Sequence, residues 1–314
     1  MTYIEIGDGV EYIGNYALNN PYYGSPTGDR GPNTTLRIVN ATPPETGEQP
    51  FPEIYTFWFW QMHNFTISVP QAARNTYNNT EPWSDYTVSG SEYSGSFAFQ
   101  VITAPDGTKS AEITSYTGNS TTIEIPETVV DSTDNTTYNV TSIKGEFLDG
   151  NSSATTLVIS RYVENIEGDF LSGNDTLRTI QVNNNNQYFS ATNGVLFSKD
   201  QTMLIKYPPA KTGNSYTMPN TTISLSNHAF ANVNVLQQLT LSNQLLVISN
   251  SAFAGATSIY RITFQTATPP YLTGFKAFRV STENGLQIRV PRNSLTTYQN
   301  SLYYRYYRSY MSGV

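Results

Sequence analysis

The side chains that most often perform catalysis are sparse in this sequence. Its two histidines are His63, within the aromatic run WQMHNF, and His228, directly before an Ala-Phe pair. We interpret both as structural or solvated, because neither joins a cluster of His, Asp or Glu with metal-ligand spacing. No G-x-S-x-G motif marks a nucleophilic serine, and the absence of cysteine excludes thiolate chemistry. The sequence predicts a protein that is not an enzyme and that holds no metal or cofactor.

Carboxylates gather around one short stretch, where a glycosidase would need two of them facing each other across a bond. They are Glu124, Glu127, Asp131 and Asp134. We interpret them as a solvated rim, since charged side chains in such a run are usually exposed.

Tyrosine and arginine form a candidate contact surface near the C-terminus, in the run YYRYYRSY. Helical spacing would place four tyrosines on one face. They are Tyr303, Tyr306, Tyr307 and Tyr310, with Arg305 and Arg308 beside them. Such residues give large contact areas at low entropic cost. The alternative, tyrosines that seal the end of the fold, stays open.

Tryptophans form a second aromatic group, in the run YTFWFW at residues 55–60. Trp58 and Trp60 offer flat apolar rings that either stack on sugars or pack in a core.

Composition disfavours several partners. The chain of 314 residues has 17 Lys+Arg against 24 Asp+Glu, a net charge of -7, and no basic run. Nucleic acid and anionic membranes are therefore disfavoured. No segment approaches the ~20 apolar residues that span a bilayer. Polarity resides in Asn, Ser, Thr and Tyr, which favours an extracellular or cell-surface protein, although no signal peptide is visible at the start.

A repeat of 23 residues positions most apolar side chains. Ala229-Phe230 returns as Ala252-Phe253. The other returning pairs are Ile223 and Leu225 as Leu246 and Ile248, and Leu239 and Leu241 as Ile262 and Phe264. A fixed period between about 20 and 50 residues is typical of a solenoid.

Each repeat has two parts. The first alternates apolar and polar residues, as in Thr156-Leu157-Val158-Ile159, and predicts a short strand with one buried face in a parallel sheet. The second reads V-x-x-I-x-x-x-F, as at residues 163–170, and predicts a helical or 3₁₀ turn. Stacked coils bury the inner residues, so binding is left to outward side chains, loops and ends.

The outward strand residues form another candidate surface, an uncharged polar ladder suited to hydrogen bonding or to simple solvation. We expect Glu124, Val158, Gln181, Thr240 and Thr263 to align, flanked by Thr156, Ser160, Ser242 and Gln265.

The phrase TSIKGEFLDGNSSATTLVISRYVENIEGDFLSG resembles the BspA-type leucine-rich repeat. Residues 181–210 look like that family's long variant repeat, and residues 97–118 like its N-terminal hairpin cap. The family's usual Cys after the Ala-Phe turn is missing. The resemblance covers about residues 97–314 and implies a β-rich leucine-rich repeat solenoid with surface adhesion as its role.

A second repeated phrase divides the chain. ATPP is followed by a Val-Pro step and a tyrosine in two places, with Pro70 before Tyr77 and Pro291 before Tyr298. In the family this unit resembles a C-terminal cap. We therefore predict one module over residues 1–88 and a capped solenoid over residues 89–314.

The first module begins directly on a strand, with no cap before it. We expect its open end to be covered by the second module, by another copy or by a further segment. The residues concerned are Thr2, Tyr3, Ile4, Glu5 and Ile6.

These features predict a non-catalytic extracellular or cell-surface binding and adhesion protein that contacts a protein or glycan. The alternative is a structural or receptor-binding component of a virus particle or filament.

Overall fold

A computed structural model describes eleven segments of the chain. They are residues 2–6, 12–13, 34–38, 45–46, 65–69, 76–77, 87–90, 92–94, 96–131, 135–274 and 285–314. The chain divides into two compact units, residues 1–102 with 130–138, and residues 103–129 with 139–314. The predicted boundary at residue 88 stays a prediction.

The first unit contains a four-stranded parallel sheet in the order β1-β3-β5-β6. Its strands are β1 (Thr2–Ile6), β3 (Thr34–Ile38), β5 (Phe65–Val69) and β6 (Thr87–Gly90). Two further strand pairs are β2 (Tyr12–Ile13) with β4 (Glu45–Thr46), and β7 (Glu92–Ser94) with β8 (Phe97–Thr103). Tyr77, from the first predicted cap phrase, is fully buried.

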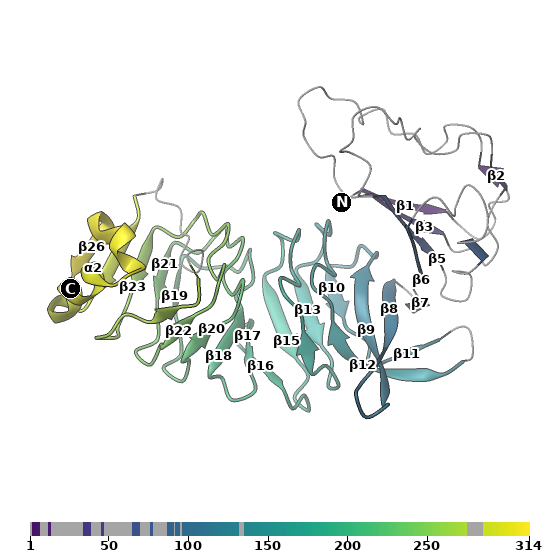
Figure 1. Cartoon of the computed structure of the whole chain (residues 1–314), viewed down its shortest axis with the longest axis horizontal. Helices are drawn as coiled ribbons and strands as arrows, with labels where there is room; N and C mark the ends of the chain where they lie inside the picture. The colour runs from purple at the N-terminus through teal and green to yellow at the C-terminus, as the bar shows by residue number, and fades with distance from the viewer. Residues whose placement is uncertain are drawn as a thin grey trace, which may run out of the picture. The chain divides into compact units, whose positions relative to one another are not determined.

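The second unit is a solenoid of short strands that follow one another from teal to yellow in Figure 1. It opens with a turn at residues 104–108, closed by the Ala104 N–H donating to the Thr108 carbonyl over 2.8 Å. Next come β9 (Lys109–Tyr116), β11 (Thr128–Val130), β12 (Thr137–Ile143) and β14 (Asn165–Ile166). β12 pairs parallel with both β9 and β14.

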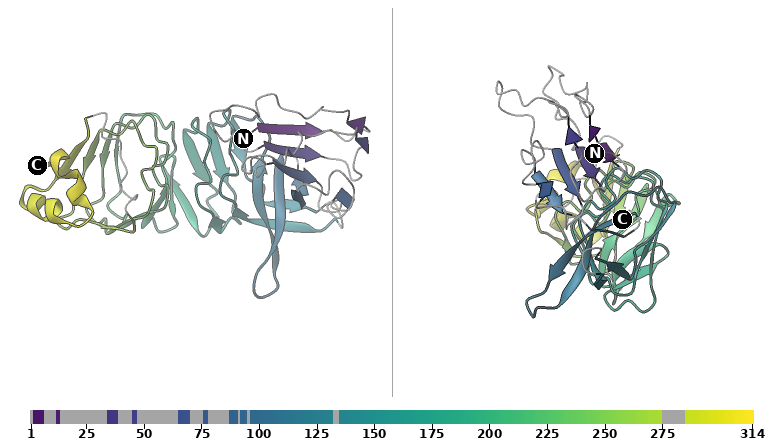
Figure 2. Two further views of the ribbon diagram at one scale, coloured as in Figure 1. Left: turned by 45° about the horizontal axis from the view of Figure 1, so that its top comes forward. Right: turned by 90° about the vertical axis from the view of Figure 1, so that its right-hand side faces the viewer.

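One face of the solenoid carries two parallel sheets. The first has β10 (Thr122–Glu124), β13 (Thr156–Ile159) and β15 (Thr179–Val182). The second has β19 (Ser215–Thr217), β21 (Gln238–Thr240), β23 (Arg261–Thr263), β25 (Gln287–Val290) and β26 (Met311–Gly313). Between β25 and β26 lie the cap helices η3 (Arg292–Ser294), α2 (Leu295–Asn300) and η4 (Tyr304–Tyr310), which close this end (Figure 2).

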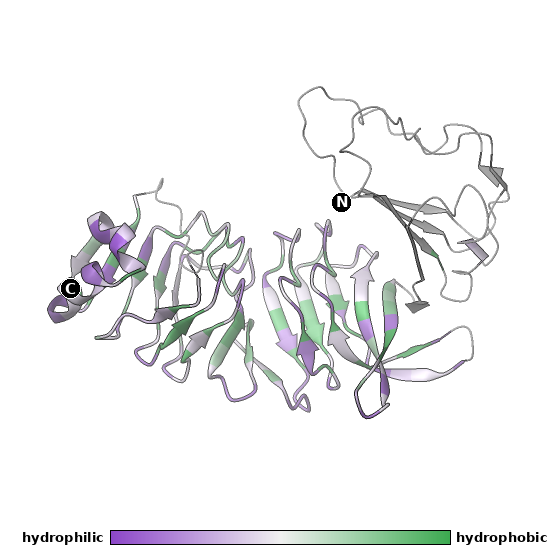
Figure 3. Cartoon of the chain, in the orientation of Figure 1, coloured by the Kyte–Doolittle hydropathy of each residue, from purple (hydrophilic) through white to green (hydrophobic). Residues whose placement is uncertain are grey.

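Stacking of the coils explains the 23-residue period. Leu239, Ile262 and Phe253 are buried as predicted, and Leu239 pairs with Ile262 across neighbouring strands. The rings of Phe230 and Phe253 stack at 5.4 Å, and Tyr207 stacks on Phe230 at 5.3 Å. Green apolar segments accordingly recur from strand to strand in Figure 3. These observations confirm the predicted solenoid.

The returning half of the described coils combines compact turns with two-residue strands. The turns are closed by hydrogen bonds across three residues, as from the Ala231 N–H to the His228 carbonyl over 3.0 Å, without extending into a continuous helix. The two-residue strands are β20 (Ser224–Leu225), β22 (Val247–Ile248) and β24 (Tyr271–Leu272). So short a strand buries one side chain, and Leu225 and Ile248 fill that place. Ile223 and Leu246, which repeat at the same interval, stand at the corner before the strand and are 40% and 63% exposed.

The long variant repeat contains antiparallel strands, an exception to the otherwise parallel stacking predicted there. They are β16 (Phe189–Thr192), β17 (Val195–Ser198) and β18 (Met203–Lys206). Asn193 and Gly194 join β16 to β17 with φ of 53° and 78°. Two successive positive φ angles are the signature of a tight hairpin turn, for which Asn-Gly is the preferred pair.

Candidate binding surface

The sheet β19-β21-β23-β25-β26 presents two outward rows of polar side chains. Side chains alternate along a strand, and Leu239, Ile262 and Ile288 point into the core. Their neighbours in sequence therefore face outward. The outer Gln–Arg row consists of Ser215, Gln238, Arg261 and Gln287. The outer Thr row consists of Thr217, Thr240, Thr263, Arg289 and Ser312.

Arg261 is the centre of the outer Gln–Arg row. Its Nη1 donates to Oε1 of Gln238 over 2.9 Å, and its Nε donates to Oε1 of Gln287 over 3.1 Å. Gln238 Nε2 donates in turn to the Tyr260 hydroxyl over 3.2 Å, and the guanidinium lies 5.5 Å from the Tyr260 ring centre. The two amides hold the guanidinium in place without neutralising its charge. Because a guanidinium has five N–H donors, three stay available to a ligand.

The part of the sequence that forms this sheet is rich in cations. Residues 201–314 contain nine Lys and Arg residues and one acidic residue, Glu283, which lies outside the described residues. Residues 1–200 contain eight Lys and Arg residues against 23 acidic ones. Between described residues, neither Arg261 nor Arg289 forms an ion pair. The net charge of the whole chain therefore conceals a cationic region, which the composition averaged away.

The predicted polar ladder exists as two separate rows. Glu124 pairs with Val158 and Val158 with Gln181 in one sheet, whereas Thr240 pairs with Thr263 in the other. Between β15 and β19 in sequence, the hairpin of β16 and β17 belongs to a third sheet, and its Gly194 carbonyl accepts from the Ile180 N–H of β15 over 3.0 Å.

Two predicted flanking residues of this ladder are wrong. Ser160 and Ser242 are buried, because the chain turns inward where each strand ends. The Ser242 hydroxyl instead accepts from the Gln244 N–H over 3.0 Å. Thr156 lies on β13, and Gln265 is exposed two residues beyond β23.

The C-terminal tyrosines separate into buried and exposed members. Tyr304, which the sequence analysis left out, is fully buried, and its hydroxyl donates to the Pro270 carbonyl over 3.0 Å. Tyr303, Tyr307 and Tyr310 pack half-buried against the core, whereas Tyr306 is 64% exposed. A 3₁₀ helix repeats every three residues, so Tyr304, Tyr307 and Tyr310 follow one line.

The arginines of the cap are exposed. Arg305 lies 5.4 Å from the Tyr306 ring centre, and Arg308 Nη2 donates to Oδ1 of Asn300 over 3.1 Å. They add two cations to the same third of the chain as Arg261.

The structure says less about the other residues predicted to bind or assemble. Trp58, Trp60 and His63 lie outside the described residues. Thr2, Tyr3, Ile4, Glu5 and Ile6 form β1, which pairs with β3 in register; no other described strand pairs with β1. Their role in assembly stays a prediction.

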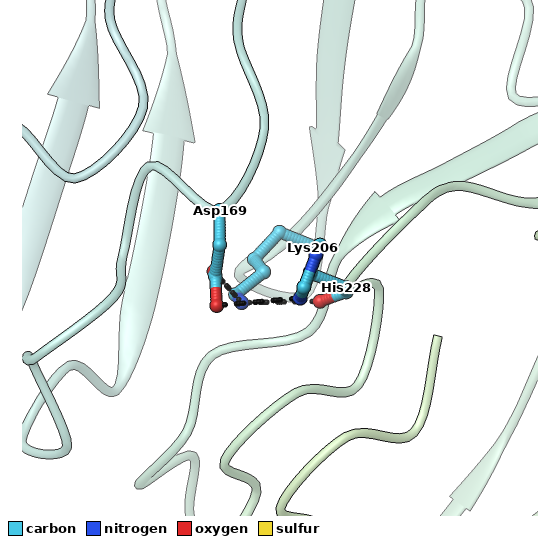
Figure 4. A network of polar contacts seen from close by, with 3 residues as sticks. All are labelled: Asp169, Lys206 and His228. Atoms are coloured by element: carbon cyan, nitrogen blue, oxygen red, sulfur yellow. Dashed lines mark hydrogen bonds and ion pairs between the residues drawn. The ribbon is translucent and has the colours of Figure 1, made fainter. Parts of the chain in front are cut away.

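A partly buried polar network joins three coils at Asp169, Lys206 and His228 (Figure 4). Lys206 Nζ lies 2.6 Å from Asp169 Oδ1 and donates to the His228 carbonyl over 3.1 Å. His228 Nδ1 lies 3.6 Å from Asp169 Oδ2. Burial lowers the pKa of the Lys206 ammonium, and the Asp169 carboxylate opposes that shift. With Lys206 only 2% exposed, this network holds coils together rather than meeting a ligand.

His228 occupies a turn position that recurs one repeat later. Its φ is 58°, and Ser251, one repeat later, has the same φ of 58°. Among the described residues, no group of His, Cys, Asp or Glu is arranged to hold a metal ion. Nor does any helix in the described segments have the length and apolar character to cross a membrane.

Comparison with protein families identifies the repeats. Residues 211–307 match the BspA type leucine-rich repeat region in 6 copies. This match contains most of the sheet around Arg261 and agrees with the predicted resemblance. No curated protein matches the chain.

Several solved leucine-rich repeat proteins are similar to the chain. One from Eubacterium ventriosum is 15% identical, with 82% of this chain and 65% of that chain covered and a TM-score of 0.37. The T. pallidum leucine-rich repeat protein is 15% identical, with 63% of this chain and 84% of that chain covered and a TM-score of 0.37. A leucine rich cell surface protein from Faecalibacterium prausnitzii is 17% identical, with 65% and 89% covered and a TM-score of 0.31.

Proposed function

We propose that this chain, which carries a BspA type leucine-rich repeat region, is a non-catalytic binding protein of the cell surface or extracellular space. Its contact surface is the outward face of the sheet β19-β21-β23-β25-β26, and its partner is a protein or a glycan. The observation that carries the proposal is the Gln238–Arg261–Gln287 arrangement, in which a guanidinium is fixed but not neutralised.

The scaffold supports this role through its rigidity. The inner residues Leu239, Ile262 and Ile288 are buried and in register, so the outward side chains between them are held at fixed spacing. A surface ordered before binding loses less conformational entropy when the partner arrives. Neighbouring strands lie ~4.8 Å apart, so the rows offer a regular series of contacts.

The test compares a blocked surface with a matched control. Thr240→Tyr with Thr263→Tyr places bulky rings on the outer Thr row, and Gln181→Tyr places one on the other sheet. Both proteins, with the parent, are applied to immobilised extracellular-matrix proteins and polysaccharides. We expect the double variant alone to lose the binding that the parent shows. Binding that survives the double variant would contradict the assigned surface.

Location is tested separately, by protease treatment of intact source cells followed by antibody detection of the chain. We expect the chain to be cleaved, and full protection in intact cells would contradict an external location. Neither the described residues nor the comparisons favour the alternative of a virus particle or filament component.

A further inference from the structure

Resting on the proposed function, we propose that the ligand of the sheet β19-β21-β23-β25-β26 is an acidic polysaccharide. Its carboxylate or sulfate groups bind Arg261 and Arg289, and its hydroxyl groups bind the outer Thr row.

The two arginines form an anion-binding pair. Thr263 is paired with Arg289 and Arg261 with Gln287, so the arginines lie on neighbouring strands two positions apart, on the same face. A strand spacing of ~4.8 Å and a rise of ~3.3 Å per residue separate their Cα atoms by about 8 Å. Each guanidinium matches a carboxylate or sulfate with two parallel hydrogen bonds. A ligand with anionic groups at intervals can therefore engage both.

The surrounding charge strengthens this match. The described residues offer no carboxylate partner to either arginine, and the last third of the chain has nine cations against one acidic residue. At physiological ionic strength, exposed charges are screened beyond about 8 Å. Acidic residues that lie farther than this from the sheet therefore do little to weaken attraction there.

The remaining side chains favour a sugar over a protein. The outward residues of these five strands are Ser, Thr, Gln and Arg, with no aliphatic or aromatic side chain among them. A stable protein interface is usually built around a desolvated apolar or aromatic core, and this sheet has none. Rows of hydroxyls and amides instead complement a ligand that is itself covered with hydroxyl groups.

The same surface is poorly suited to nucleic acid. Single-stranded nucleic acid is held by aromatic rings interleaved with cations. The outward residues of these five strands carry no aromatic ring, and the Tyr260 ring just before β23 already has the Arg261 guanidinium 5.5 Å from its centre.

The experiment measures binding of the full chain to immobilised polysaccharides by interferometry. The probes are polygalacturonate, which carries carboxylates, and dextran sulfate. Methyl-esterified polygalacturonate and plain dextran are their neutral counterparts. We expect at least one acidic probe to bind about tenfold or more tightly than its neutral counterpart, and binding to weaken as salt rises. The stronger of the two acidic probes identifies the anionic group.

Variants then locate the site. Arg261→Gln and Arg289→Gln are each expected to weaken binding about tenfold. Arg261→Lys keeps the charge but loses the planar fork, and we expect an intermediate loss. Arg178→Gln removes an exposed cation beside the other sheet and should leave affinity within about twofold. Thermal melting of each variant verifies that it is folded.

Several results would overturn the proposal. Equal binding of acidic and neutral polysaccharides would contradict the recognition of anionic groups. Binding of poly-glutamate as tightly as the acidic polysaccharides would contradict the recognition of a sugar. Tighter binding of single-stranded DNA than of either acidic polysaccharide would contradict the proposed class of ligand. An Arg261→Gln variant with parental affinity would contradict the proposed binding site. If proteins bind through the outer Thr row but no polysaccharide binds, this inference fails while the proposed function stands.

Discussion

The ammonium of Lys206 lies 2.6 Å from the carboxylate of Asp169, in the position that alanine fills in the next two coils. Stacking of Tyr207 on Phe230, and of Phe230 on Phe253, fixes that correspondence. The residues before these rings are Lys206, Ala229 and Ala252. The long repeat thus joins its neighbour through a buried ion pair where other coils use a small apolar side chain.

Loss of Asp169 should be costly. Asp169→Ala leaves the buried Lys206 ammonium without its carboxylate, and breaking such a pair costs about 3–5 kcal/mol in the free energy of unfolding. Combining it with Lys206→Met removes the unpaired charge and should restore most of that loss. Urea denaturation measures both. Glu127→Ala, which removes the exposed Arg161–Glu127 pair, should stay within about 1 kcal/mol. An Asp169→Ala variant as stable as the parent would contradict the assignment.

Alkaline pH should destabilise the C-terminal cap. Burial raises the pKa of Tyr298 to about 12 and also raises the pKa of Tyr304. The pKa of each tyrosine is higher in the folded state than the unfolded value of about 10. Their contribution to the free energy of unfolding is therefore fully present below pH 10. Their contribution is lost as pH rises from about 10 through 12. Phenolate absorbance and circular dichroism, followed together, should change together over that range. Ionisation of all tyrosines with no change in dichroism would show that the cap does not depend on them.

The aromatic stack should dominate the stability of the middle coils. Phe253→Ala removes a fully buried ring that stacks on Phe230, and comparable losses cost about 3–5 kcal/mol. Tyr306→Ala removes an exposed ring and should change stability by less than about 0.5 kcal/mol. Thermal or urea unfolding distinguishes them, and similar losses for both variants would argue against the stack.

Two glycines with positive φ should respond differently to alanine. Gly173 has a φ of 73°, and an added Cβ would lie 2.8 Å from the Gly150 nitrogen and 3.0 Å from the Asp149 Cα. Gly213 has a φ of 102° and open space around it. Gly213→Ala should cost about 1–2 kcal/mol from backbone strain alone. Gly173→Ala should cost more, because neighbouring backbone must also move. Equal melting temperatures would contradict the close packing at Gly173.

The repeat made the solenoid predictable, because positions such as Phe230 and Phe253 have one structural role at a fixed interval. The 23-residue period did not predict burial at the corners before β20 and β22. Ile223 and Leu246 repeat as faithfully as Leu225 and Ile248, yet they are exposed. Spacing of two residues implies a shared face only while the chain stays extended, and these strands last two residues.

More of the candidate site was predictable from the same 23-residue spacing. Thr240 and Thr263 were predicted, whereas Gln238 and Arg261 lie two positions earlier on the same strands and also repeat after 23 residues. The position of Arg289 in the site was not predictable from the repeat, because residues outside the regular period separate β23 from β25. The Asp169–Lys206 pair, 37 residues apart, required knowledge of how the long repeat realigns with its neighbours.

The hairpin at Asn193-Gly194 keeps the row from Glu124 to Gln181 in a different sheet from the rows around Arg261. Mutations that accumulate on one row therefore meet no cross-strand neighbour on the other. Natural selection can alter either set of side chains independently, on a single backbone whose hydrophobic interior stays unchanged.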